Sequence, residues 1–429
     1  MYNLRGGFLI RPLTIALTLG GAGAFLSWLE EVFPIVSNWV PAVLFPSHAD
    51  PQVAQVILAG IAASIMTVVS IVFAILLMTL TLASMQFSPR IIVSFSRDRV
   101  TQWTLGIFLG TFSYCMAALP AAHSFPKPFA PVVTVLGAMV LAATCVGLLL
   151  FFIHHISQAI SVNSIIDRIA AETEGIIDEM MPHLHHPDRL HVSAPLRPDP
   201  SDVAVLSGDS GYIRFIDKRR LIAVAKQYHV TIRTLRRVGH FVPAGIPLMM
   251  VSKGSRLPAA GATELLAAFD IGPTRTLQQD VEFGVLQIVD IALKAISPAV
   301  NDPTTAINCV DHLSRILIRF ASREPPDNLI YDPPGIARAS MEWIHFEQLL
   351  EVAFEQIRMY STSDMAVSLR LLRALGDIAS STPDPEFHRI LAEFGARIVG
   401  GCEGLSEEAL KQLHSRQARL ERFTAAATA

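Results

Sequence analysis

Charged residues are scarce in this chain, and their scarcity is uneven. Asp, Glu, Lys and Arg make up 17% of the 429 residues, against about 25% in soluble domains, while hydrophobic residues reach 51%. The charges crowd into the C-terminal two-thirds. A net charge of −3, without a basic stripe with interleaved aromatic residues, gives no sign of nucleic-acid binding. The imbalance predicts an N-terminal membrane domain followed by a soluble part.

Cysteine is also rare, and its spacing excludes two common uses. The chain has only four, at Cys115, Cys145, Cys309 and Cys402, and they form no CxxC pair. The spacing favours neither a disulfide framework nor a zinc site, so we expect four buried, reduced thiols. We expect no bound metal and no cofactor.

The signatures of common enzymes are missing as well. The sequence has no GxSxG, HExxH or P-loop motif, and no pair of carboxylates at a credible catalytic spacing. We therefore expect that the chain is not an enzyme.

Four long stretches without Asp, Glu, Lys or Arg occupy the N-terminal third. A helix needs about 20 mostly apolar residues to cross a bilayer, and each stretch provides close to that number or more. The sequence predicts a transmembrane domain over residues 1–155, with spans near residues 12–29, 54–82, 103–121 and 131–153.

The first span has an alternative reading as a signal peptide. Arg5 and Arg11 precede it, and residues 22–24 form a small-residue cleavage site. The apolar run continues beyond that site to Leu29, and Trp28 suits a membrane interface. We favour a membrane anchor.

Loop charges predict the orientation of the spans. The N-terminus carries Arg5 and Arg11, and the second loop carries three arginines, whereas the first loop has acidic residues only. By the positive-inside rule, both termini lie in the cytoplasm. We expect a multi-pass protein of a bacterial inner membrane whose first partner is the lipid bilayer.

Small and polar residues recur along one face of the second span. They fall within an arc of about 120° at helical spacing. A face of this kind packs against another helix or lines a pore, and the sequence leaves both readings open. Gly106 and Gly110 form a GxxxG in the third span, which indicates helix packing. The candidate pore or packing face consists of Gly60, Ser64, Thr67, Ser70 and Thr81.

The C-terminal part predicts a cytoplasmic α+β domain in three segments. Residues 156–200 continue the fourth span as a stalk helix and then form a linker, and the stripe of isoleucines on the stalk requires a partner in the chain or in another subunit. Residues 201–255 form a small β-rich module, with strands near 203–206, 212–216, 230–235 and 248–251. Residues 256–429 are helical, and the prolines near 325–334 mark a loop between helices.

The run from Ser297 to Thr305 predicts a break between two helices. Ser297-Pro298 ends the first helix, and Asn301 or Asp302 caps the second, with Pro303 in its first turn. One alternative is an exposed helix N-terminus that binds an anion or a polar ligand. Another is that Asp280, Glu282 and Asp290, just before the corner, gather a cation. The candidate ligand corner consists of Asp280, Asp290, Asn301, Asp302, Thr304 and Thr305.

Three stretches together resemble a known family. They are residues 84–90 (Ser-Met-Gln-Phe-Ser-Pro-Arg), the module at 210–251, and the segment from Gln279-Asp280-Val281-Glu282-Phe283-Gly284 to Thr305. The chain resembles the bacterial predicted membrane proteins of domain-of-unknown-function family 2254 over nearly its whole length. The resemblance implies four N-terminal spans and a cytoplasmic C-terminal domain, and it implies no reaction and no catalytic residues.

Two classes of function fit these features. The first is a homo-oligomeric channel or transporter with a cytoplasmic regulatory domain, favoured by the small face of the second span and by the stalk. The second is a membrane-anchored sensor or scaffold whose cytoplasmic domain binds a ligand or partner. No span carries a charge at its centre, which disfavours a proton-relay pump.

Overall fold

The computed structural model describes residues 10–33, 50–86, 99–123, 128–159, 161–181, 199–324, 326–332, 335–402, 404 and 406–428. The chain divides into two compact units, Met1–Ser161 and Val162–Ala429. Each unit has hydrophobic clusters of its own. The residues of the expected membrane exit and surface segment at 87–98, and of the linker at 182–198, lie outside the described part.

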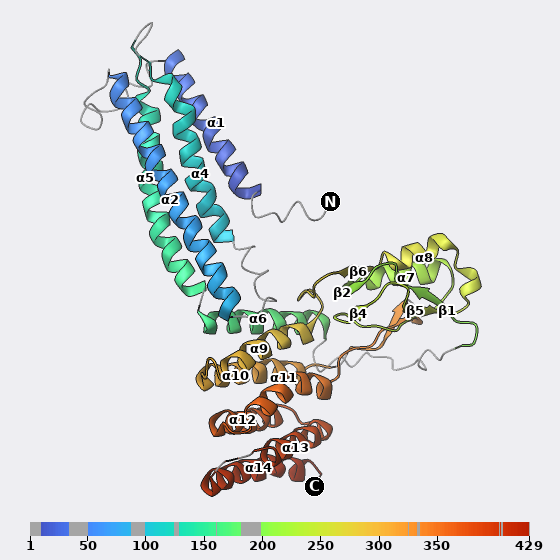
Figure 1. The fold of residues 1–429 in the computed structure, drawn as a ribbon. Coiled ribbons are helices and arrows are strands. Elements are labelled where there is room, and N and C mark those ends of the chain that lie inside the picture. The colour runs from blue at the N-terminus through green and yellow to red at the C-terminus, as the bar shows by residue number, and fades with distance from the viewer. Residues whose placement is uncertain are drawn as a thin grey trace. The chain divides into compact units, whose positions relative to one another are not determined.

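The first unit consists of long apolar helices (Figure 1). They are α1 (Ile10–Val32), α2 (Pro51–Gln86), α4 (Arg99–Ala118, extended by the 3-10 turn η2, Leu119–Ala121) and α5 (Val132–Ala159). Within the described residues, four helices are long and apolar enough to cross a membrane, so the prediction of four apolar helices is confirmed. The 36 residues of α2 extend over about 54 Å at 1.5 Å per residue, well beyond a hydrocarbon core of about 30 Å.

Helices α1 and α4 approach each other through glycines. A Cβ added at Gly106 would lie 2.6 Å from the Ile15 side chain, and one at Gly110 would collide with Leu19. A Cβ added at Gly23 of α1 would lie 2.6 Å from the backbone carbonyl oxygen of Tyr114. Small residues of this kind let two backbones come close. The packing role predicted for Gly106 and Gly110 is confirmed.

The second unit begins with α6 (Val162–Met180). Its isoleucine stripe is buried, and the helix packs against α9 (Val281–Ala295) and α10 (Pro303–Ala321). Helix α5 ends at Ala159 and α6 begins at Val162, so the continuous stalk expected from the sequence is two helices. The isoleucines of α6 are buried against α9 and α10, within the second unit. Residue 160 lies outside the described part.

The β-rich part of this unit contains two sheets (Figure 1). The strands are β1 (Val203–Leu206), β2 (Gly211–Ile216), β3 (Ile232–Thr234), β4 (Phe241–Val242), β5 (Pro247–Val251), β6 (Phe269–Gly272), β7 (Leu329–Asp332) and β8 (Ile336–Ser340). One sheet has the order β1-β5-β3-β8-β7 and the other the order β4-β2-β6. Helices α7 (Lys218–Gln227) and α8 (Ala259–Leu266) accompany them. The strands pair antiparallel except β3 and β8, which are parallel.

The sheets take in more of the chain than the sequence indicates. Strands β1, β2, β3 and β5 lie where the sequence predicts them, but β6, β7 and β8 come from the region expected to be helical or looped. Strand β8 pairs with β3, with Ile232 opposite Ala339. This pairing joins segments about a hundred residues apart, so no local pattern shows it. The β-rich part therefore extends beyond residue 255.

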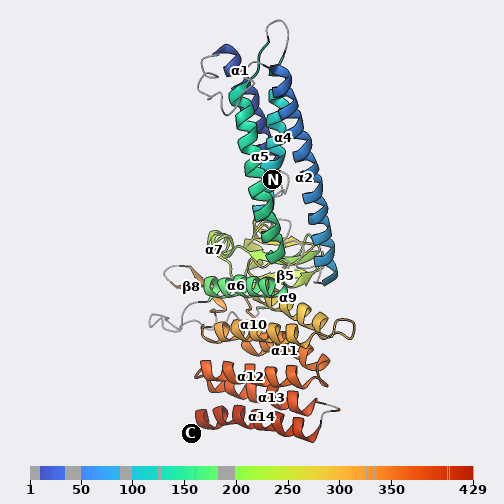
Figure 2. The same cartoon turned by 90° about the vertical axis from the view of Figure 1, so that its left-hand side faces the viewer.

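Six helices follow in stacked layers (Figures 1 and 2). After α9 and α10 come α11 (Phe346–Tyr360), α12 (Met365–Ser381), α13 (Pro385–Gly400) and α14 (Glu407–Thr428). Helix α9 packs on α11, α10 packs on α12, and α12 packs on α14. Each pair of helices thus covers the apolar face of the pair before it, as in helical repeat proteins.

Aspartates begin four of these helices. Asp280 accepts a hydrogen bond from the backbone of Phe283, and Asp302 accepts one from Thr305. Asp364 and Asp384 cap α12 and α13 in the same way. A carboxylate at this position satisfies amides that the helix leaves free. The capping role expected for Asp302, with Pro303 in the first turn, is confirmed.

The glycine contacts between α1 and α4 give a direct test. We expect Gly23→Ala to destabilise the folded protein by about 1–3 kcal/mol, because its methyl group meets a backbone carbonyl that cannot move aside. Gly21→Ala is the matched control, since nothing lies within 4 Å of a Cβ at Gly21. Thermal unfolding of both variants in detergent is the measurement. Equal melting temperatures would contradict the close approach of α1 and α4.

Candidate functional site

The small face of α2 is exposed in the protomer. Gly60, Ser64, Thr67, Ser70 and Thr81 all lie on the outside, and a Cβ added at Gly60 would meet nothing within 4 Å. The opposite face of α2 is the one that packs against α4 and α5, through Ala54, Leu58, Ala62, Ile65, Val69 and Val72. The small face therefore does not serve packing within the described part of its own chain.

The hydroxyl groups on this face are held by their own helix. Thr67 donates to the carbonyl oxygen of Ala63 at 3.0 Å, and Ser70 donates to that of Met66 at 3.0 Å. Such back-bonding satisfies the donor and makes the side chain tolerable at an apolar surface. The oxygen lone pairs that remain can accept hydrogen bonds from a molecule outside the helix.

Glu30 is a buried carboxylate that sequence reasoning missed. It lies in the last turn of α1, and its oxygens accept hydrogen bonds from the backbone of Val133 at 2.7 Å and of Thr134 at 2.8 Å. The Thr134 hydroxyl also donates to it, at 2.5 Å. Glu30 thus caps the N-terminus of α5 from a neighbouring helix. In the sequence it resembled an ordinary loop charge, and only its place at the end of an apolar run gave a signal.

Two further polar contacts gather near the same end of α5. The Tyr114 hydroxyl donates to the carbonyl oxygen of Thr134 at 3.1 Å. The Gln55 amide of α2 donates to the carbonyl oxygen of Ala122 at 2.5 Å. Directional bonds therefore join α1 and α4 to α5, and α2 to the segment that follows η2. This end of the unit is fixed more strictly than apolar packing alone would fix it.

The predicted ligand corner is only partly assembled. Asn301, Asp302, Thr304 and Thr305 lie together at the start of α10. Asp280 lies at the opposite end of α9, which spans about 22 Å over its 15 residues. Asp290 lies within α9. The structure thus separates Asp280 from the corner that the sequence grouped with it.

Asp302 takes up the groups that would receive an anion. It accepts from the backbone and the hydroxyl of Thr305, at 3.1 and 2.6 Å. These hydrogen bonds from Thr305 hold the pKa of Asp302 below its ordinary value, so the carboxylate is charged at neutral pH. A charged carboxylate at the helix N-terminus repels a second anion. The corner therefore has a sufficient structural explanation.

Arginines neutralise the acids at the start of α9. Arg275 donates two hydrogen bonds of 2.8 Å to Asp280. Glu282 lies 2.8 Å from Arg237, on the turn between β3 and β4, and 3.7 Å from Arg275. Within the described residues, no group of three His, Cys, Asp or Glu side chains is placed to hold a metal ion. This charge cluster joins the β-rich part to the helical stack.

A shallow cleft lies beside this cluster. Its walls combine the end of α6, the start of α9 and residues 341–344, and they include Met181, Met341 and Trp343. The open space is about 50 Å³, which holds only a few waters at about 10–15 Å³ each and is smaller than the roughly 150 Å³ that accepts benzene. In its present form the cleft does not accommodate a drug-sized ligand.

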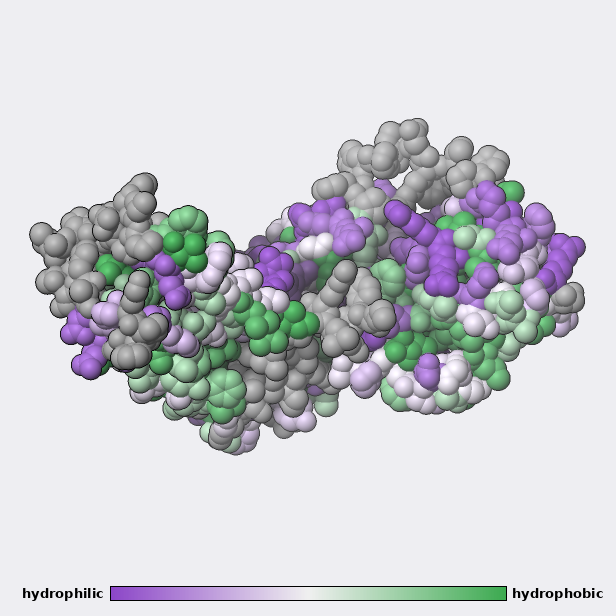
Figure 3. Space-filling model, turned by 90° about the horizontal axis from the view of Figure 1, so that it is seen from above, coloured by the Kyte–Doolittle hydropathy of each residue, from purple (hydrophilic) through white to green (hydrophobic). Residues whose placement is uncertain are grey.

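One face of the β-rich part is largely polar. In the space-filling view, hydrophilic residues gather over the β-rich part, with smaller hydrophobic areas between them (Figure 3). A surface of this kind suits contact with water. It contrasts with the apolar helices of the first unit.

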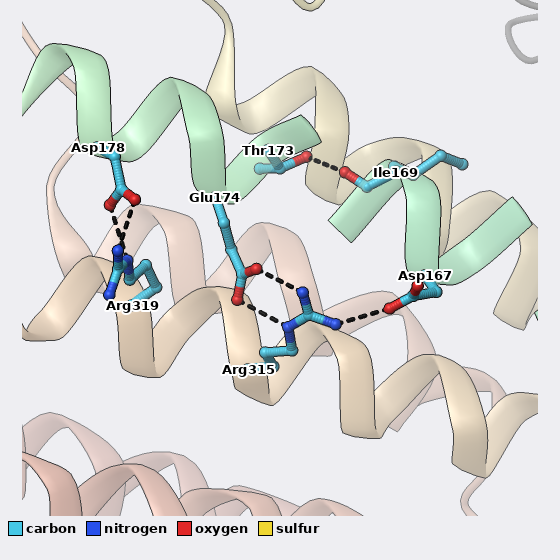
Figure 4. Close-up of polar contacts among 7 residues, drawn as sticks. All are labelled: Asp167, Ile169, Thr173, Glu174, Asp178, Arg315 and Arg319. Carbon is cyan, nitrogen blue, oxygen red and sulfur yellow. Dashed lines mark hydrogen bonds and ion pairs between the residues drawn. The ribbon is translucent and has the colours of Figure 1, made fainter. Parts of the chain in front are cut away.

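Ion pairs fasten α6 to α10 (Figure 4). Arg315 donates to Glu174 at 2.8 and 2.6 Å and to Asp167 at 2.7 Å. Arg319 donates two hydrogen bonds, of 2.7 and 2.5 Å, to Asp178. Paired contacts of a guanidinium with a carboxylate fix orientation as well as distance. We call these pairs the α6 clamp.

A buried arginine completes the α6 clamp. Arg323 also donates to Asp178, and its side chain is only 3% exposed. Hydrogen bonds from Arg319 hold the pKa of Asp178 below its ordinary value. The same helix touches α9, where a Cβ added at Gly284 would collide with the Thr173 hydroxyl. Helix α6 is therefore an integral part of the second unit.

The α6 clamp predicts unequal effects for two neutral substitutions. Asp178→Asn should destabilise the second unit by about 1–2 kcal/mol, because it weakens the partner of the buried Arg323. Asp167→Asn should cost at most about 0.5 kcal/mol, because Asp167 is 62% exposed and Arg315 keeps its second carboxylate. Thermal unfolding is the measurement. Equal losses of stability would show that the buried arginine does not depend on Asp178.

The chain is similar to a family of membrane proteins and to several mycobacterial proteins. Residues 5–377 match the family described as "Predicted membrane protein (DUF2254)". Uncharacterized proteins of Mycobacterium bovis and of Mycobacterium tuberculosis are 34% identical to it over 390 residues, which cover 89% of this chain and 73% of each relative. No solved structure matches. With its four apolar helices and the matched residues spanning both units, the chain belongs to the DUF2254 family of predicted membrane proteins.

Proposed function

We propose that this protein is the subunit of a homo-oligomeric channel or transporter of the bacterial inner membrane. In this proposal α1, α2, α4 and α5 cross the bilayer, both termini lie in the cytoplasm, and the second unit regulates the membrane part. The arginines of the N-terminus and of the second loop support this orientation. The proposal includes no enzymatic step.

The exposed small face of α2 carries the proposal. Gly60 and Ser64 add little apolar area to a surface facing lipid, and α2 buries its opposite face inside the protomer. A face of small and hydroxyl residues is suited to close approach of a second subunit or to a water-filled path. In a symmetric oligomer, the same α2 face of every subunit is available to surround a central axis.

The chemistry of this face limits what passes. The hydroxyls of Thr67, Ser70 and Thr81 donate to carbonyls of their own helix, so they offer acceptor oxygens to a permeating molecule. The face carries no charged side chain. A path of this kind favours uncharged molecules or weakly selected ions over a proton relay, which needs ionisable groups in the membrane.

Chain connectivity supports regulation by the second unit. Only residues 160 and 161 separate the end of α5 from the start of α6, and the α6 clamp ties α6 to α10. In this proposal, a change in the second unit reaches the end of α5 along this short stretch of chain. The other end of α5 is held by hydrogen bonds with Glu30 and Tyr114.

Solute flux and labelling test the channel proposal together. In a variant without native cysteines, Ser64→Cys should react with a water-soluble thiol reagent in liposomes, and the reaction should block ion or solute flux. Leu150→Cys is the control. Leu150 is an exposed apolar residue of α5, which in this proposal faces lipid, so its cysteine should not react with the water-soluble reagent. Absence of flux at any voltage, tension or pH, with no labelling of Ser64→Cys, would refute the proposal.

The sensor or scaffold function is the second candidate. The observation in its favour is that Val162–Ala429 forms a compact unit with its own core, as a ligand- or partner-binding domain does. The small volume of the cleft favours a protein partner over a drug-sized ligand. A thermal-shift screen without a hit, together with normal signalling after truncation, would count against this function.

The boundary of that unit leads to a folding prediction. A fragment of residues 162–429 should unfold cooperatively, whereas a fragment of residues 202–429 should aggregate, because removing α6 uncovers the apolar faces of α9 and α10. Size-exclusion chromatography and thermal unfolding distinguish the two. Equal behaviour of both fragments would show that α6 is not part of the folding unit.

A further inference from the structure

The turn between β3 and β4 contacts the start of α9 through Arg237, which also holds a histidine of the turn. Arg237 Nε donates to His240 Nε2 at 2.9 Å, and Arg237 also pairs with Glu282. Gly239 of the same turn has φ +90°, and a Cβ there would lie 2.5 Å from Arg275 and 2.6 Å from Asp280. Because glycine alone allows this approach, the turn seats directly on the charge cluster. We call this contact the module joint.

The hydrogen bond in the module joint fixes the charge of His240. An imidazole nitrogen accepts a hydrogen bond only through its lone pair, so Nε2 carries no proton and the ring is neutral. Protonation at Nε2 would turn this acceptor into a donor facing another donor. The bond between Arg237 and His240 would then be lost.

The surroundings of His240 oppose its positive charge. Burial lowers the pKa of His240, and Arg237, Arg236 and Arg275 lower it further, while Glu282 alone acts in the opposite direction. Arg236 and Arg237 belong to the turn itself, whereas Arg275 and Glu282 belong to the segment against which it packs. Protonation therefore places a cation among three others, while Arg237 already pairs with Glu282 and Arg275 with Asp280.

We propose that His240 is a proton-sensitive switch that loosens the module joint between the β-rich part and α9 in acid. The signal is the proton concentration of the compartment that the second unit faces. Protonated His240 repels Arg237 and no longer accepts its hydrogen bond. Arg237 then shifts, its pair with Glu282 weakens, and the turn can leave the start of α9. The switch deepens the regulation proposed for the second unit, and it rests on that function only for its consequence in the membrane.

The direction of the pH effect follows from linkage. A base whose pKa is lower in the folded joint than in the open joint contributes its full stabilisation above the ordinary histidine value of about 6.5. That stabilisation is lost as the pH falls from there towards the lowered pKa of the closed joint. With one proton involved, the equilibrium constant for opening rises by at most about tenfold per pH unit.

Amide hydrogen exchange of the full chain in detergent tests the switch. Between pH 7.5 and 5.5, after correction for intrinsic exchange, peptides covering the turn and the start of α9 should lose protection, with up to about tenfold faster opening per unit. His240→Gln keeps an acceptor that does not titrate, so its exchange should be flat over this range. An equal acid response in His240→Gln and in the unchanged protein would overturn the proposal.

A second histidine serves as the control. His312 lies on α10, where burial also lowers its pKa, and Asp167, Arg315, Asp311 and Glu174 are the charges around it. His312→Gln should leave the acid response of the module joint unchanged. If that variant abolishes the response instead, the switch lies at the α6 clamp and not at His240, and the proposal fails.

A measurement on the unchanged protein covers the case in which the variants do not fold. Exchange of the imidazole C2 hydrogen, followed by mass spectrometry, reports the pKa of each histidine in the full chain. We expect a value for His240 below the ordinary 6.5; a value at or above it would overturn the proposal. None of these readouts uses flux, so failure of the switch and failure of the channel proposal are distinguishable.

Discussion

The close approach of α6 to α9 is the contact on which the second unit depends. Because Gly284 has no side chain, Thr173 can sit against the backbone of α9, and this brings the isoleucines of α6 into the core between α9 and α10. From the other side, Arg315 and Arg319 of α10 reach the acids of α6. The interface therefore has an apolar half and an ionic half. Helix α6 is thereby packed inside the second unit, although its sequence also fits a free stalk.

Several acidic residues of this chain serve helix ends. Asp280 and Asp302 looked like ligands in the sequence, and the structure uses both as caps. Glu30 performs the same task between two helices, by capping α5 from α1. A cap by a neighbouring helix fixes where two helices meet, whereas a cap from within one helix fixes only where it begins. In the apolar unit a carboxylate thus joins two helices at one end, small residues let α1 approach α4, and larger apolar side chains fill the rest of the core.

Local patterns in the sequence were sufficient for much of the fold. Long apolar runs gave the four helices of the first unit, and the alternation of residues gave β1, β2 and β5. Contacts between distant segments were not visible. Strand β8 pairs with β3, and Arg319 finds Asp178 across 141 positions, and no periodicity encodes either. Of the candidate sites, the sequence identified the small face of α2 but not its exposure, because which face of a helix is covered depends on its neighbours. The module joint was missed since its members lie on separate segments that only the folded chain brings together.

The layered helices have a consequence for how such a protein varies. The family match ends at residue 377, within α12, while the stack continues through α13 and α14. Lys411, Arg416 and Arg419 of α14 are exposed. The outer face of this helix is therefore polar, while its inner face packs on α12 and α13. Because each pair of helices touches only its neighbours, a pair added or removed at this end affects only the face of the pair next to it. A stack of this kind can change in length by steps of two helices where the new last pair has a polar outer face, whereas the interlocked apolar bundle has no such unit.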